Sequence, residues 1–223
     1  MTTDNTQLLP TVEQVINEDG AFAVVIRNWW PNAQELHQHM ITDLPWVTRT
    51  TEYNGKVTTI KRQSCFMADE HIKHYPFGTL HAHNWHNSNN YVFNEARHIR
   101  DCIKNDTWIK QMLGIELHFD SCLAQNYAKP TDKIAYHSDQ EALGPLNAVV
   151  TLSLGDDILF RFRSKQKGSN GRYPRKDVIL GNGDLTVMAG RCQELWTHGI
   201  EEDKTGTRLP RESLTYRCVT SNT

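Results

Sequence analysis

The feature that most constrains the fold is a series of short apolar runs that fills the second half of the chain. Turn-like breaks separate these runs, such as the Gly-Asp-Asp of residues 155–157 and the Gly-Asn-Gly of residues 181–183. Short strands at regular spacing are typical of antiparallel sandwiches and double-sheet jelly rolls. The strands that this pattern predicts are 120–127, 134–138, 148–154, 158–163, 178–180, 184–188, 195–198 and 213–219.

The first half of the chain mixes helix and strand signals. We expect a strand over residues 21–26 and a hairpin at Asn54-Gly55, because Asn-Gly is the strongest short hairpin signal. The other local signals predict helices over 11–16, 33–41, 92–103 and 107–113. The expected fold class is therefore α+β, with one domain over residues 1–223. Residues 119–223 would form a double-stranded β-helix (jelly-roll) core, and residues 1–118 an N-terminal α/β extension.

Composition narrows the function classes. No apolar run reaches the roughly 18 residues of a membrane span, and the first residues lack the pattern of a signal peptide. We therefore expect an intracellular protein, cytoplasmic or nuclear, that acts as a monomer and does not bind a membrane. The five cysteines are scattered and form no C-x-x-C pair, which argues against a disulfide framework and a thiolate zinc site. The net charge of −2 excludes a protein that is basic overall, but not a local basic patch.

A metal-ligand pattern stands at the end of a predicted strand, in Ile134-Ala-Tyr-His137-Ser-Asp139. Side chains at i and i+2 of a strand face the same side, so His137 and Asp139 can reach one ion. His198 ends a later predicted strand. Two imidazoles and one carboxylate are the facial triad that suits iron(II) and leaves open coordination positions. His-x-Asp alone more often means a surface histidine and a turn aspartate.

An arginine pair on the last predicted strand completes the pattern. Arg211 and Arg217 are six positions apart and therefore lie on one face of a strand. Guanidinium groups pair with carboxylates in two-point contacts, and 2-oxoglutarate carries two carboxylates. The alternative is exposed charge on an edge strand. The order of His-x-Asp, distal His and spaced arginines favours a 2-oxoglutarate site.

The second half of the chain resembles the AlkB family of nucleic-acid demethylases, which depend on iron(II) and 2-oxoglutarate. The family's H-x-D reads here as His137-Ser-Asp139, its distal histidine as His198, and its terminal R-x-N-L-T-[FY]-R as Arg211-Glu-Ser-Leu-Thr-Tyr-Arg217. The resemblance covers residues 119–220 well. It is weaker before them, where Lys61-Arg62-Gln63 resembles the family's substrate lid. It implies iron(II), 2-oxoglutarate and O₂ as metal and co-substrates.

The resemblance also implies roles for single residues around the co-substrate. Tyr127 and Arg211 would hold its far carboxylate, and Arg217 would lie nearer its C1 carboxylate. Two positions depart from the family pattern, because Ser213 and Gln125 stand where asparagine is usual. Both replacements keep hydrogen-bonding capacity, so we expect them in the same shell.

The expected substrate contacts combine aromatic and cationic side chains, since a base must leave its stack to reach a buried iron. Residues 160–176 contain seven Lys and Arg and no acid, and Arg161 and Arg163 begin this basic segment. By resemblance, Lys61 and Arg62 belong to the lid, Tyr75 is a lid aromatic, and Glu141 reads an exocyclic amino group. The alternative for each is ordinary solvated charge or packing.

The predicted function is oxidative demethylation of N-alkylated bases in DNA or RNA, with release of formaldehyde. The low net charge favours single-stranded substrate. One alternative is the same iron chemistry on a protein, lipid or small molecule. Another is a non-catalytic module that recognises modified nucleic acid, against which the intact ligand set argues.

Overall fold

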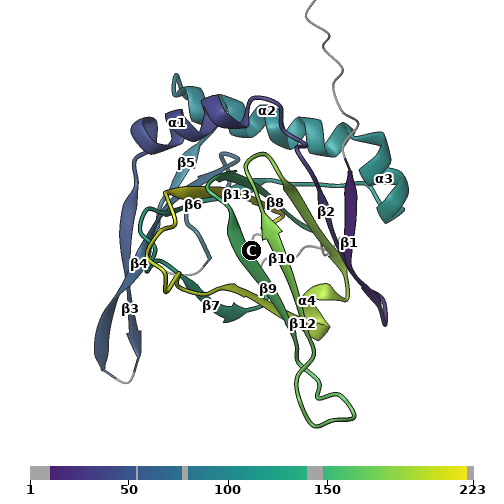
Figure 1. Ribbon diagram of the computed structural model, residues 1–223. Coiled ribbons are helices and arrows are strands. Elements are labelled where there is room, and N and C mark those ends of the chain that lie inside the picture. Colours follow the sequence, from purple (N-terminus) through teal and green to yellow (C-terminus); the bar gives the residue numbers. More distant parts are fainter. Residues whose placement is uncertain (1–10, 54, 77–79, 140–147, 220–223) are drawn as a thin grey trace, which may run out of the picture.

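Two facing β-sheets with helices on one side make up the molecule, as seen in a computed structural model (Figure 1) that describes residues 11–53, 55–76, 80–139 and 148–219. The larger sheet follows the order β1 (Val12–Glu18), β2 (Ala21–Ile26), β11 (Leu185–Gly190), β8 (Val149–Gly155), β13 (Arg211–Arg217), β6 (Ser121–Tyr127), β4 (Lys56–Ala68) and β3 (Val47–Tyr53), with β5 (Ala82–Asn84) beside β4. The smaller sheet follows the order β10 (Arg175–Leu180), β9 (Ile158–Ser164), β12 (Trp196–Ile200) and β7 (Ile134–His137).

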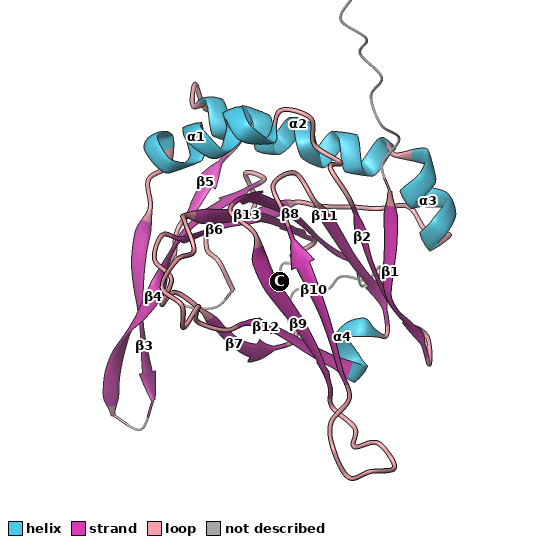
Figure 2. Cartoon of the chain, viewed as in Figure 1, coloured by secondary structure: helices cyan, strands magenta, loops and turns pink. Residues whose placement is uncertain are grey.

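The helices cover the outer face of the larger sheet (Figure 2). They are α1 (Ala33–Asp43), α2 (Tyr91–Asn105) and α3 (Thr107–Leu113), and a single turn, α4 (Cys192–Leu195), leads into β12. Leu36 and Met40 of α1 are fully buried against this face, and Tyr216 of β13 donates a hydrogen bond to Ala96 O of α2 at 3.0 Å. One face of β13 therefore packs against the helices, and its other face points toward the smaller sheet.

Alternation along β13 sorts its residues between the two faces. Leu214 and Tyr216 belong to the helix-side core, whereas Arg211, Ser213 and Arg217 point to the opposite face. That face meets the smaller sheet across a second apolar core, which contains Phe160, Phe162, Trp196 and Tyr127. A polar strip of the larger sheet is therefore enclosed between the two sheets.

The predicted helix over residues 11–16 is wrong, because this segment is the edge strand β1. It pairs antiparallel with β2, and Asp19 and Gly20 between them have φ angles of 52° and 77°. Positive φ at both central residues is what a two-residue hairpin turn requires, and Asp-Gly is a preferred sequence for it. The Asp19-Gly20 dipeptide was therefore a sequence signal for a β-hairpin at this position.

The other expected elements are found with small shifts in their bounds. The predicted helix 107–113 coincides with α3, and Gly114 ends it with a φ of 65°. The hairpin at Asn54-Gly55 connects β3 and β4, although Asn54 itself lies outside the described residues. The largest shift is in β10, which begins at Arg175 rather than 178 and extends the basic hairpin with β9. The observed architecture is a mostly antiparallel jelly roll, as expected for residues 119–223.

The N-terminal half does not stand apart from this core. Its strands β2 and β4 pair with β11 and β6 and so continue the larger sheet at both ends. In the described part of the chain, no helix combines the length and apolar character needed to cross a membrane.

Candidate active site

Pairing of β7 with β12 brings the three predicted metal ligands together. His137 and His198 lie directly opposite each other in this pair, and Asp139 follows His137 by two positions. His137 Nε2 is 3.8 Å from Asp139 Oδ1, and His198 Nε2 is 3.6 Å from Asp139 Oδ2. One ligand atom from each side chain lies within 4.8 Å of the other two. The three residues can therefore share one ion.

The polar atoms of this cluster that lack a hydrogen-bond partner fit a divalent cation. Asp139 is buried, and its Oδ2 has no hydrogen-bond partner among the described residues. A buried carboxylate oxygen without a partner is costly unless a cation completes it. His137 Nδ1 lies 2.9 Å from Ala135 O, and since a carbonyl only accepts, the Nδ1–H must donate. This contact leaves the Nε2 lone pair of His137 for a metal.

Burial keeps the second imidazole neutral. The ring of His198 stacks on Phe160 at a centroid distance of 5.4 Å and lies near Phe162 at 6.3 Å. This burial lowers the pKa of His198 to about 3, against the opposing attraction of Asp139. For Asp139, burial raises the pKa, but Arg217 and the two histidines outweigh it and the pKa is lowered overall. Neutral imidazoles and an ionised carboxylate are the forms that bind a metal.

Two residues that the sequence analysis did not assign to the site, Gln193 and Lys165, hold the ligand segment in place. Gln193 Oε1 accepts a hydrogen bond from the backbone N–H of Asp139 at 2.9 Å. Lys165 Nζ donates to Ser138 Oγ and to Gln193 O, each at 2.9 Å. These partners are 27 to 54 positions apart in the chain, so no local sequence motif predicts the contacts between them.

Arg211 is a buried cation next in the sequence to the buried Glu212, whose carboxyl group pairs with His37 instead. Arg211 is 1% exposed, and in the described part of the chain it forms no ion pair. Its Nε and Nη2 donate only to Ser153 Oγ, at 3.2 and 3.0 Å, and its guanidinium lies 5.2 Å from the ring centre of Tyr127. A buried charge needs a partner to offset its desolvation. A carboxylate of a ligand is the group that this guanidinium lacks.

The remaining predicted co-substrate residues line the same inner face. Strand register places Tyr127 opposite Arg211 and Gln125 opposite Ser213. Directly opposed residues of an antiparallel pair share a face. Tyr127 Oη donates to Gln125 Oε1 at 3.3 Å, and both residues are buried. The five residues expected around 2-oxoglutarate thus form one strip beside the metal ligands, with Arg217 at its other end.

A cavity of about 200 Å³ opens onto the metal ligands, and its walls include Arg62 and Tyr75. Tyr75 packs edge-on against Phe66 at 5.1 Å between ring centres, which fixes its plane. His137, Asp139, Arg217 and Gln125 line the same cavity. The structure therefore brings two of the predicted substrate residues to the predicted iron site.

The other predicted substrate residues lie elsewhere. Lys61 is exposed on β4 and does not line this cavity. Arg161 forms ion pairs with Asp177 at 3.0 Å and Glu201 at 2.8 Å, away from the cavity. Arg163 stacks over Tyr136 at 4.6 Å, at the base of the hairpin between β9 and β10. Glu141 falls outside the described residues.

Comparisons with known proteins identify related oxygenases. The model of the 2OG-Fe(II) oxygenase superfamily matches residues 22–217. A Bos taurus protein named alpha-ketoglutarate-dependent dioxygenase alkB homolog 3 is 34% identical over 106 residues, which are 45% of this chain and 37% of that protein. An Arabidopsis thaliana protein named DNA oxidative demethylase ALKBH2 is 22% identical over 223 aligned positions, which cover 90% of this chain and 67% of that protein. The chain thus spans well under half of the bovine relative.

The fold is also found among solved structures. The structure of OsALKBH1 superposes with a TM-score of 0.58 at 17% sequence identity, and the match covers 92% of this chain and 100% of that one. At this identity the likeness concerns the fold alone. This structural likeness and the match of the family model are both consistent with the jelly roll of two facing sheets. The chain belongs to the 2OG-Fe(II) oxygenase superfamily, whose name refers to 2-oxoglutarate and iron(II), and it is similar to AlkB-type dioxygenases.

Proposed function

We propose that this protein oxidatively demethylates N-alkylated bases in nucleic acid. The observation that carries the proposal is the makeup of the cavity, in which Tyr75, Arg49 and Arg62 line the same space as His137 and Asp139. An aromatic ring offers a stacking surface to a base, and guanidinium groups offer contacts to phosphates. The names of two relatives, an alkB homolog and a DNA oxidative demethylase, support the same substrate class.

His137, Asp139 and His198 would hold iron(II), and Arg211 with Tyr127 would hold the far carboxylate of 2-oxoglutarate. When bound, iron(II) with 2-oxoglutarate and O₂ supplies an oxidant that hydroxylates an N-methyl group, giving succinate and CO₂, and the hydroxymethyl product releases formaldehyde. Arg217 keeps Asp139 ionised and oriented through its 2.8 Å hydrogen bond. The apolar rings of Phe160 and Phe162 limit the access of water to His198.

The β3–β4 hairpin would act as the substrate lid in this scheme, within one catalytic domain. Arg49 and Arg62, which line the cavity, belong to these two strands. Arg62 Nη1 donates to Lys133 O at 3.1 Å and so connects the hairpin to the segment before β7. A flipped base would enter between this hairpin and the metal ligands.

The hairpin between β9 and β10 would bind the phosphate backbone. It projects from the body of the molecule (Figure 1), and Lys167, Arg172 and Arg175 on it are exposed. Its base borders the active site, because Lys165 donates to Ser138 between two metal ligands. On a chain with a net charge of −2, such a local cluster favours contact with a polyanion. We propose single-stranded DNA or RNA, because this patch is too small to offset the cost of opening a duplex.

The test is a screen of methylated DNA and RNA oligomers with iron(II), 2-oxoglutarate and ascorbate, read by mass spectrometry and by formaldehyde. We expect loss of a methyl group and matching amounts of formaldehyde and succinate, with single strands preferred over duplexes. His137→Ala should bind the same oligomer with unchanged affinity and leave it methylated. Succinate that forms only on addition of protein or metabolite substrates would contradict the nucleic-acid assignment while leaving the iron site intact.

A further inference from the structure

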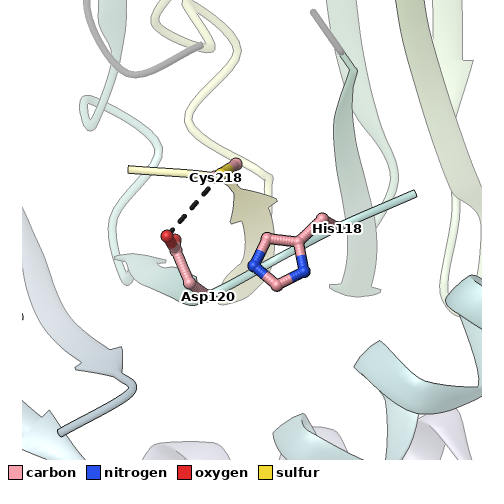
Figure 3. Close-up of side chains that lie close together, drawn as sticks. All are labelled: His118, Asp120 and Cys218. Carbon is pink, nitrogen blue, oxygen red and sulfur yellow. Dashed lines mark hydrogen bonds between the residues drawn. The ribbon is translucent and has the colours of Figure 1, made fainter. Parts of the chain in front are cut away.

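A second group of potential metal ligands lies outside the iron site, where β6 begins and β13 ends (Figure 3). His118 and Asp120 stand on the segment that leads into β6, and Cys218 follows the last residue of β13. One ligand atom from each of the three lies within 4.8 Å of the others. The Cys218 thiol donates to Asp120 Oδ2 at 3.6 Å. The cluster thus offers one nitrogen, one oxygen and one sulfur.

The carboxylate of this group is held in place by the backbone. Asp120 is 3% exposed, and its Oδ1 accepts a hydrogen bond from Val219 N at 2.7 Å. Its own backbone N–H donates to Arg217 O at 3.2 Å, and its carbonyl accepts from Asp69 N at 2.8 Å. Oδ2 is therefore positioned toward Cys218 before any ligand arrives.

The imidazole of the group is available to a ligand. His118 is exposed, and no hydrogen bond or ion pair engages its ring within the described ranges. In Figure 3 the ring lies beside the carboxylate of Asp120 and the sulfur of Cys218. An accessible histidine beside a buried aspartate and a half-buried cysteine leaves an entry path from solvent.

We propose that His118, Asp120 and Cys218 form a zinc(II) site separate from the iron site. Zinc accepts nitrogen, oxygen and sulfur ligands together, and three protein ligands leave a fourth tetrahedral position for water. The thiolate sets this site apart from the iron site, because a soft sulfur ligand selects zinc over hard cations.

Zinc uptake exchanges a proton for the metal. The Cys218 thiol faces Asp120 Oδ2 at 3.6 Å and donates its proton to that oxygen in a hydrogen bond. On binding, the S–H bond breaks, a Zn–S bond forms, and one proton goes to solvent. The carboxylate already faces the thiol, so zinc would take the place of that proton.

The site would fasten two strands that carry the co-substrate strip. Ser121 and Arg217 are opposed residues of β6 and β13, and each adjoins a zinc ligand in the sequence. A metal that joins Asp120 to Cys218 resists separation of the two strands next to Arg217. The scattered cysteines argued against a thiolate site, but Cys218 and Asp120 are 98 positions apart and meet only through this strand pairing.

Cobalt(II) is the probe, because a cobalt–thiolate bond gives a near-ultraviolet charge-transfer band that nitrogen and oxygen ligands do not give. The measurement uses metal-free His137→Ala protein, in which the iron site is disabled. We expect a saturable band, its loss in Cys218→Ser, and affinity at least about tenfold weaker in His118→Ala, whose exposed side chain is not needed for folding. Cys102→Ser is the matched control, since Cys102 is also half-buried and lies 3.7 Å from a histidine ring, and it should keep the band. Absence of the band, or its persistence in Cys218→Ser, would overturn the site.

Thermal unfolding gives a second readout that does not depend on activity. Zinc should raise the melting temperature of His137→Ala, because a ligand that binds only the folded chain stabilises it. The rise at the same zinc concentration should be smaller in His137→Ala carrying His118→Ala as well. Equal rises in both proteins would contradict the proposal even if both bind zinc.

Discussion

Arg217 Nη2 donates a hydrogen bond to Asp139 Oδ1 at 2.8 Å, and the other oxygen of this carboxylate, Oδ2, has no hydrogen-bond partner among the described residues. Both side chains are 9% exposed. One oxygen thus anchors the carboxylate to the larger sheet, and the other remains for a metal. The ion pair joins the two sheets at the point where the reaction is proposed to occur.

Removal of this carboxylate should affect stability and activity separately. Asp139→Ala leaves Arg217 buried without a counter-charge, which typically costs about 3–5 kcal/mol of unfolding free energy. Urea unfolding of the metal-free protein measures this loss. The double variant Asp139→Ala, Arg217→Met should recover most of the stability and no turnover. If the double variant is as unstable as Asp139→Ala, the loss of stability does not come from the unpaired charge of Arg217.

Arg211 should govern saturation by 2-oxoglutarate. Arg211→Met keeps most of the buried volume and removes the cation, and loss of one partner of a buried charge pair costs about 2–5 kcal/mol. We expect the co-substrate concentration at half saturation to rise about 30-fold or more. Arg161→Met is the control, because its guanidinium pairs with Asp177 and Glu201 instead. Similar saturation curves for Arg211→Met and wild type would remove Arg211 from the site.

Tyr75 should act on the nucleic acid and not on the co-substrate. Tyr75→Ala removes a stacking surface worth about 1–3 kcal/mol per base, so the KM for a methylated oligomer should rise about 5- to 150-fold. Tyr75→Phe keeps the ring and should behave like wild type. Steady-state kinetics with the oligomer and with 2-oxoglutarate varied separately check both statements. A change confined to the 2-oxoglutarate KM would argue against stacking.

The basic hairpin should account for the salt dependence of binding. Lys167→Ala with Arg172→Ala removes two exposed cations, and the slope of log affinity against log salt should fall by about 0.7 for each phosphate that is no longer neutralised. The paired control is Lys104→Ala with Lys110→Ala on the helix layer, which should leave the slope unchanged. Equal slopes in the two double variants would place the phosphate-binding surface elsewhere.

Gln193 should act as a positioning residue for the metal. Gln193→Ala removes the acceptor of the Asp139 backbone N–H and should weaken iron binding about 10- to 100-fold, the usual effect of losing a supporting partner. Gln193→Glu keeps an acceptor oxygen and should restore part of the affinity. Anaerobic iron titration measures both variants, and unchanged affinity in Gln193→Ala would assign Gln193 a purely structural role.

The sequence allowed prediction of those parts of the site that local patterns encode. Strand alternation alone places Arg211 and Arg217 on one face of β13. The short spacing of His137 and Asp139 pointed to a shared ion, although Asp139 lies two residues beyond the end of β7. The opposition of His137 and His198 depends on the β7–β12 register, which no local pattern states. The same holds for Gln193, whose partner is 54 positions away.

The missed strand β1 illustrates a different limit. Its residues are mostly exposed, so an edge position left little apolar alternation to detect. The charges of Arg161 and Arg163 likewise did not reveal their partners. Arg161 is held by two acids and Arg163 by an aromatic ring, and both arrangements arise only from tertiary packing.

The most direct test of the assigned centre is an anaerobic titration of the metal-free protein with iron(II), followed by 2-oxoglutarate. The co-substrate bound in a two-point manner to iron(II) gives a visible charge-transfer band. We predict this band in the wild type, none in His198→Ala, and a displaced 2-oxoglutarate titration in Arg211→Met. A band of equal intensity in His198→Ala would contradict the convergence of His137, Asp139 and His198 on one ion.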